Sequence, residues 1–161
     1  MLTAQEALIQ LQEGNQRFVE GKLTRNTNYT QRRNELVDGQ TPFAIILGCS
    51  DSRVPTEIVF DQGLGDLFVI RIAGNIVAPS QIGSIEFAVE TFQTPLVVVL
   101  GHTGCGAVAA TLNQIRQPQA SRSQHLHSIV ERIRPAVEPL SEIRTDLAHE
   151  NLLERAIRSN V

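Results

Sequence analysis

Hydrophobic side chains recur at helical spacing near the start of this chain. Over residues 3–19 they return every three or four positions, and Thr3 and Glu6 form a capping box, which predicts an amphipathic helix. A shorter helical pattern covers residues 31–37. The two patterns together predict an N-terminal helical arm over residues 1–39.

Short uninterrupted apolar runs follow the arm and predict buried strands. They are Phe43–Leu47, Leu67–Ile72 and Leu96–Leu100. Helical patterns begin after Ser80 and again at Ala107, so strands and helices alternate. Such alternation is typical of βαβ units. The sequence therefore predicts an α/β fold with a parallel β-sheet core flanked by helices.

The last part of the chain predicts further helices. A polar loop over residues 117–124 precedes helical patterns at 126–137 and 141–158. A length of 161 residues suits one domain. Its expected parts are the helical arm (1–39), the sheet and the candidate site (40–116) and the C-terminal helices (117–161).

Composition and charge restrict the partners that we expect. The net charge is -3, there is no Trp, and the sequence has neither a basic stripe nor aromatic platforms, so nucleic-acid binding is disfavoured. No apolar run approaches the roughly 18 residues that cross a bilayer. The N-terminus also lacks the pattern of a signal peptide. We therefore expect no membrane partner and a cytoplasmic location.

The two cysteines each follow a predicted strand. Cys49 lies in the loop 48–55 after the first strand, and Cys105 lies in the Gly-rich loop 101–106 after the third. Loops at the carboxyl ends of parallel strands meet at one edge of a sheet, so these loops can converge. With His102 they offer two thiolates and one imidazole. This donor set suits zinc and leaves a fourth position for water or substrate.

Other readings of these residues remain open. Free cysteines are often plain core residues. A nucleophilic Cys49 beside Arg53, as in a phosphatase loop, is disfavoured because Asp51 would repel a phosphate. Asp51 and Arg53 form either a carboxylate held beside the metal or an ordinary surface ion pair. The helix that follows Cys105 has N–H groups and a dipole that would favour the Cys105 thiolate.

The two loops resemble the paired signature motifs of the β-class carbonic anhydrases of bacteria and plants. The motifs are Cys49-Ser-Asp-Ser-Arg53 and His102-Thr-Gly-Cys105, and the likeness extends through residues 61–66, 69–75 and 83–89. The resemblance implies that Cys49, His102 and Cys105 bind one Zn²⁺ per chain. It also implies that Asp51 and Arg53 form the catalytic dyad.

The resemblance further implies an activity and an assembly. The expected reaction is the reversible hydration of CO2 to bicarbonate and a proton, by attack of zinc-bound hydroxide. Gln40 and Phe68 would form part of a substrate pocket at a subunit interface, and the Gly106 N–H would donate to bicarbonate. We therefore expect a homodimer or a higher homo-oligomer.

Members of the family usually continue into at least one more strand beside the third strand, whereas this sequence ends at Val161. The family's last strand region is therefore expected to be missing, with the third strand at a sheet edge. Two alternatives to CO2 hydration stay open. One is a zinc-binding but catalytically idle oligomeric scaffold, and the other is a hydrolase of a CO2 analogue such as carbonyl sulfide.

Overall fold

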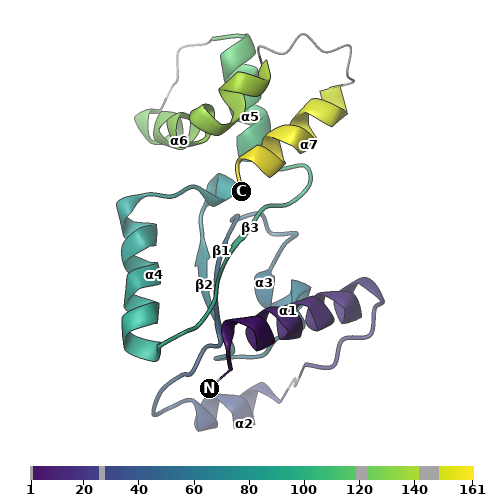
Figure 1. The fold of residues 1–161 in the computed structure, drawn as a ribbon, viewed down its shortest axis with the longest axis vertical. Coiled ribbons are helices and arrows are strands. Elements are labelled where there is room, and N and C mark those ends of the chain that lie inside the picture. Colours follow the sequence, from purple (N-terminus) through teal and green to yellow (C-terminus); the bar gives the residue numbers. More distant parts are fainter. Residues whose placement is uncertain (1, 26–27, 119–122, 142–148) are drawn as a thin grey trace. The chain divides into compact units, whose positions relative to one another are not determined.

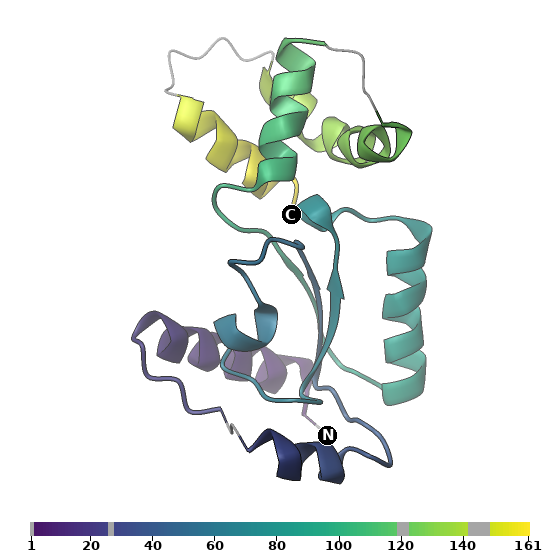
Figure 2. The ribbon, with the colours of Figure 1, turned by 180° about the vertical axis from the view of Figure 1, so that it is seen from behind.

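The three predicted strands form one sheet in the computed structural model, which describes residues 2–25, 28–118, 123–141 and 149–161. The strands are β1 (Ala44–Gly48), β2 (Leu67–Arg71) and β3 (Val97–Leu100). They lie in the order β2-β1-β3, so β1 is central and β3 is at an edge (Figures 1 and 2). The parallel sheet flanked by helices confirms the predicted α/β class.

The helices largely follow the predicted pattern. They are α1 (Ala4–Val19), α2 (Tyr29–Glu35), α3 (Thr56–Val59), the 3₁₀ turn η1 (Ala73–Asn75), α4 (Pro79–Phe92), α5 (Gly106–Arg116), α6 (Gln124–Ser141) and α7 (His149–Ser159). The sequence pattern does not predict α3 and η1, because each is about one turn long and shows no periodicity. Parts of the predicted loop at 117–124 and of the predicted helix at 141–158, namely 119–122 and 142–148, lie outside the described residues.

The chain contacts group into two compact units. The first comprises Met1–Leu47, Ser52–Ile70 and Ala78–Val98, and the second comprises Gly48–Asp51, Arg71–Val77 and Val99–Val161. The organisation as one domain stays a prediction.

In the first unit, α1 packs on α3 and β1 is buried throughout. The predicted capping box is present, since Glu6 N donates to Thr3 Oγ1 at 3.2 Å and Thr3 N donates to Glu6 Oε2 at 2.7 Å. Gly14 allows the close approach, because a Cβ there would lie 1.8 Å from the Phe60 carbonyl oxygen. The helix α1 is therefore fixed by both local capping and tertiary packing.

The second unit has its own apolar core, in which α5, α6 and α7 pack on one another and η1 packs on α5 and α6. The buried core residues are Cys49, Ile76, Cys105, Val108, Leu112, Ile133, Val137, Leu152, Ala156 and Ile157. Gly74 in η1 has φ 68, and a Cβ there would lie 2.6 Å from Ile133 Cδ1. This close packing holds η1 beside the loop that carries Cys49.

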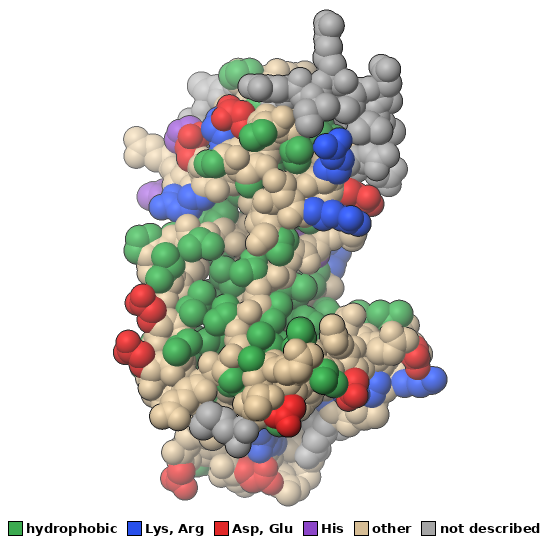
Figure 3. Space-filling model, in the orientation of Figure 1, with side chains coloured by type: hydrophobic (Ala, Val, Ile, Leu, Met, Phe, Trp, Pro, Cys, Tyr) green, Lys and Arg blue, Asp and Glu red, His purple; other side chains and the backbone are tan. Residues whose placement is uncertain are grey.

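One face of the first unit exposes hydrophobic side chains. They gather over α4 and the strands (Figure 3). On α4 the exposed fractions are 44% for Ile82, 54% for Phe87 and 43% for Val89, and Val97 on β3 is 42% exposed. Contiguous exposed apolar surface of this kind is typical of an interaction site.

Candidate metal centre

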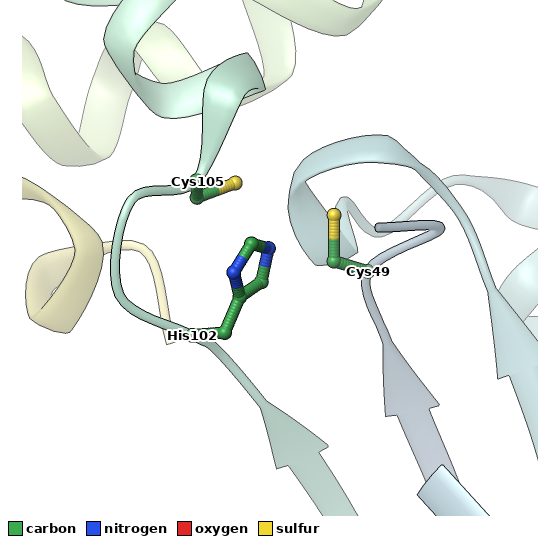
Figure 4. A group of neighbouring side chains, drawn as sticks. All are labelled: Cys49, His102 and Cys105. Atoms are coloured by element: carbon green, nitrogen blue, oxygen red, sulfur yellow. The ribbon is translucent and has the colours of Figure 1, made fainter. Parts of the chain in front are cut away.

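Cys49, His102 and Cys105 lie together in the second unit. Their side chains point toward one another from the loops that follow β1 and β3 (Figure 4). One donor atom from each, a thiol Sγ or an imidazole nitrogen, lies within 4.8 Å of the other two. The predicted convergence of the two loops is thus present in the structure.

The loop of Cys49 is held by hydrogen bonds from Arg71, Ile72 and Gly74. Ile72 N donates to Gly48 O at 3.0 Å, and Gly74 N donates to Cys49 Sγ at 3.3 Å. The Arg71 guanidinium adds two further bonds, from Nε to Cys49 O at 2.9 Å and from Nη2 to Asp51 O at 2.6 Å. The sequence analysis does not single out Arg71. The one feature of the sequence that could have drawn attention to Arg71 is its position, because it is a charged residue at the end of an otherwise apolar strand.

The loop of Cys105 is shaped by the start of α5. Gly104 has φ 66, a left-handed conformation that glycine adopts without strain, and Cys105 is the N-cap residue of α5. The Cys105 side chain is turned into the core, where the residue is only 1% exposed. Gly106, the first residue of α5, is exposed, and the first N–H groups of a helix have no partner within it.

His102 presents an open nitrogen to the two thiols. Its Nδ1 lies 3.0 Å from the Thr103 carbonyl oxygen, which can only accept, so Nδ1 carries the proton in that bond and Nε2 keeps a lone pair. Nε2 is buried and has no hydrogen-bond partner among the described residues. A carboxylate oxygen of Asp51 lies 3.9 Å from it.

The two cysteines differ in acidity. Burial raises the pKa of Cys49, but the Gly74 N–H, the adjacent His102 ring and the Asp51 N–H outweigh it and lower that pKa overall. Burial likewise raises the pKa of Cys105, and the neighbouring Cys49 charge raises it further. The N–H groups of Val108 and Ala107 at the start of α5 do lower the Cys105 pKa, as expected, but burial outweighs them.

These features fit a divalent zinc ion. A lone imidazole nitrogen buried without a partner is costly unless something binds it. Two close thiolates repel each other unless a cation lies between them. Zinc binds this combination of two thiolates and one neutral imidazole, and such a set leaves one coordination position for another ligand.

The remaining predicted site residues are placed as follows. Asp51 is half-buried in the second unit, and Arg53 is exposed in the first, so their pairing stays a prediction. Gln40 is exposed beside Arg33, Leu36 and Leu64 in a pocket of the first unit. Phe68 is half-buried, and its ring centroid lies 6.0 Å from that of Phe92. The substrate-pocket roles of Gln40 and Phe68 also stay predictions.

Comparison with known proteins gives consistent matches. Residues 44–161 match the carbonic anhydrase family. A carbonic anhydrase of Mycolicibacterium smegmatis is 46% identical over 127 residues, which are 79% of this chain and 61% of that protein. The chain thus spans less than two thirds of this relative's length.

Solved structures agree with these sequence matches. The β-carbonic anhydrase CafA of Aspergillus fumigatus has a TM-score of 0.70 and 31% identity, covering 83% of this chain and 62% of that one. A chain from the crystal structures of two tetrameric β-carbonic anhydrases of Sordaria macrospora is also similar, with a TM-score of 0.64 and 28% identity over 82% of this chain and 69% of that chain.

Proposed function

The chain belongs to the β-class carbonic anhydrase family, and from this premise we propose that it catalyses the zinc-dependent, reversible hydration of CO2 to bicarbonate and a proton. The observation that carries the proposal is the group formed by Cys49, His102 and Cys105, in which an imidazole nitrogen with no partner in the described part of the chain lies beside two buried thiols. Each chain would hold one Zn²⁺ through these three side chains.

The bound ion would supply acidification of a water molecule, more weakly than at a three-histidine site because two thiolates neutralise its formal charge. The chain's own residues would provide the rest. The Asp51 carboxylate would accept a hydrogen bond from the attacking water and so direct the oxygen lone pair at the carbon of CO2. Arg53 would keep Asp51 ionised and correctly oriented.

Product binding would use the start of α5. Gly106 is exposed, and its N–H lies at the positive end of the helix dipole and would donate to a bicarbonate oxygen. We propose Gln40 and Phe68 as further pocket residues, contributed across a subunit interface. CO2 is small and apolar, so an apolar slot with one orienting amide would suit it.

We also propose that the chain forms a homodimer or a higher homo-oligomer. The exposed Ile82, Phe87 and Val89 on α4 support this assembly, because a second copy of the chain would bury them. A similar solved chain comes from the crystal structures of two tetrameric β-carbonic anhydrases. None of the described helices is long and apolar enough to span a membrane, and the cytoplasmic location stays a prediction.

Zinc content and stopped-flow CO2 hydration, measured on wild type and Asp51→Ala, test the proposal. We expect one zinc per chain in both proteins and a large loss of hydration in Asp51→Ala. Full zinc without hydration in wild type would support the idle scaffold instead. Turnover of carbonyl sulfide in preference to CO2 would identify the analogue hydrolase.

A further inference from the structure

Two asparagine side chains join the end of α7 to η1. Asn75 Nδ2 donates to the Asn160 carbonyl oxygen at 3.3 Å, and Asn160 Nδ2 donates to the Gly74 carbonyl oxygen at 2.9 Å. These reciprocal bonds connect residues that are 85 and 86 positions apart in the sequence. Asn75 is 4% exposed and Gly74 is buried, so water could not readily replace these hydrogen bonds if they were broken.

Gly74 also contacts the candidate metal centre, through its backbone N–H. Gly74 N donates to Cys49 Sγ at 3.3 Å, while Gly74 O accepts from Asn160. A continuous path of hydrogen bonds therefore runs from the Asn160 amide through the Gly74 backbone to the Cys49 sulfur. All of these residues lie in the second unit.

The turn that carries Gly74 requires support from outside. It is a single 3₁₀ turn, in which Asn75 N donates to Ile72 O at 3.0 Å. Gly74 and Asn75 have positive φ values of 68 and 43, and a non-glycine residue adopts this conformation only at some energetic cost. Packing on Ile133 limits where Gly74 lies, and the bond from Asn160 sets the direction of its carbonyl.

We propose that Asn160 is a positioning residue for Cys49, and the proposal rests on the proposed role of Cys49 as a zinc ligand. By fixing the orientation of Gly74, Asn160 keeps the Gly74 N–H directed at the sulfur. Hydrogen bonds to the groups that bind a metal orient those groups and tune their charge, and their loss weakens metal binding. Asn160 thus acts on the metal centre without touching it.

A neighbouring hydrogen bond provides a matched control. Ser159 Oγ donates to Ala136 O at 2.7 Å, which ties α7 to α6 without involving η1. Ser159→Ala therefore removes a bond of the same type at the next residue and leaves the path to Cys49 intact. If the asparagine bonds only stabilise the packing of α7, the Ser159 and Asn160 variants will behave alike.

The experiment uses the full chain loaded with zinc, in wild type and in Asn160→Ala, Asn160→Asp and Ser159→Ala. Asn160→Asp keeps the size of the side chain but replaces the donor with an acceptor, so it separates the hydrogen bond from packing volume. Transfer of zinc to a chromogenic chelator gives the rate of metal loss. After exchange for Co²⁺, the thiolate-to-cobalt absorption band reports how the sulfur ligands are bound.

We expect both Asn160 variants to release zinc about 10-fold faster than wild type and to show an altered cobalt–thiolate band. Ser159→Ala should match wild type in both measurements. Asn75→Asp, which tolerates the same backbone conformation but loses the donor to Asn160, should shift in the same direction and provides a second variant if an Asn160 variant does not fold.

Zinc release and a cobalt spectrum unchanged from wild type in Asn160→Asp, or in Asn75→Asp should the Asn160 variants not fold, would overturn the positioning role alone. Equal changes in Ser159→Ala and Asn160→Ala would also overturn it, in favour of a packing role. A wild-type chain that takes up no zinc would overturn the metal site itself, and with it this inference.

Discussion

Two buried polar groups of this molecule differ in how their hydrogen-bonding capacity is used. The Asp61 side chain in the first unit is fully buried and accepts bonds from Arg17 Nε at 2.6 Å, Thr24 Oγ1 at 2.9 Å and the N–H groups of Thr24 and Arg25 at 3.0 Å. In the second unit, His102 Nε2 is buried, has no hydrogen-bond partner among the residues that the structure describes, and lies beside two thiols.

The difference separates a structural group from a candidate site. Burial raises the pKa of Asp61, but the bonds from Arg17, Thr24 and Arg25 outweigh it and hold the pKa well below its usual range. The charge is thus satisfied by the protein itself. The Cys-His-Cys group has lone pairs that the described residues do not satisfy, and a metal cation would complete it. Unsatisfied hydrogen-bonding capacity, rather than burial alone, distinguishes the candidate metal centre from the structural Asp61 cluster.

The largest expected effect is the loss of zinc when a proposed ligand in the Cys-His-Cys group is removed. His102→Ala and Cys49→Ser should fall from one zinc per chain to nearly none, because three protein ligands are the minimum set of such a site. Metal analysis after dialysis measures this. His127→Ala, which changes an exposed histidine on α6, is the control and should keep its zinc. A His102→Ala protein with one zinc per chain would refute the ligand assignment.

Removal of Asp61 should instead affect folding. Asp61→Ala should lower the free energy of unfolding by about 3 kcal/mol, because it leaves the half-buried Arg17 and two backbone N–H groups without their acceptor. Urea denaturation measures the change. Glu20→Ala, which removes an exposed pair with Lys22, should change the free energy of unfolding far less than Asp61→Ala does. Equal effects of the two variants would show that the Asp61 cluster contributes no more than a surface ion pair.

A smaller loss of stability is expected at the close contact between α1 and Phe60, in the same unit as Asp61. Gly14→Ala should destabilise the protein by about 2 kcal/mol, since the new Cβ would overlap the Phe60 carbonyl and force the backbone to move. Gly83→Ala on α4 meets no neighbour and should be neutral or stabilising by about 0.5 kcal/mol. Thermal unfolding of both variants compares them. A fully stable Gly14→Ala protein would contradict the observed approach of α1.

The smallest expected effect is on the pH dependence of stability. The pKa of Asp61 is lowered in the folded state relative to its ordinary value of 3.8, so its stabilising contribution is complete above about pH 4 and declines as the pH falls further. Urea midpoints from pH 6 to pH 3 should therefore fall more steeply in wild type than in Asp61→Ala. Parallel slopes would mean that Asp61 does not carry this acid sensitivity.

Much of the fold could be predicted from local patterns. The strands are short runs of branched apolar residues, and β1 is buried throughout. Thr3 and Glu6 mark the start of α1, because a capping box is encoded by two residues three positions apart. The short α3 and η1 have no such code, and neighbouring elements stabilise them more than their own residues do.

For the candidate site, the sequence by itself determined the family and the convergence of Cys49, His102 and Cys105, because parallel strands bring their carboxyl-end loops to one edge. Only the tertiary structure decided how Arg71 and Gly74 bond to Cys49, how Asn160 bonds to Gly74, and which cysteine is the more acidic. Those features depend on hydrogen bonds and burial between segments far apart in the chain. Local periodicity and spacing do not determine which distant backbone groups come into contact. These contacts therefore depend on how the helices and turns pack in the folded protein.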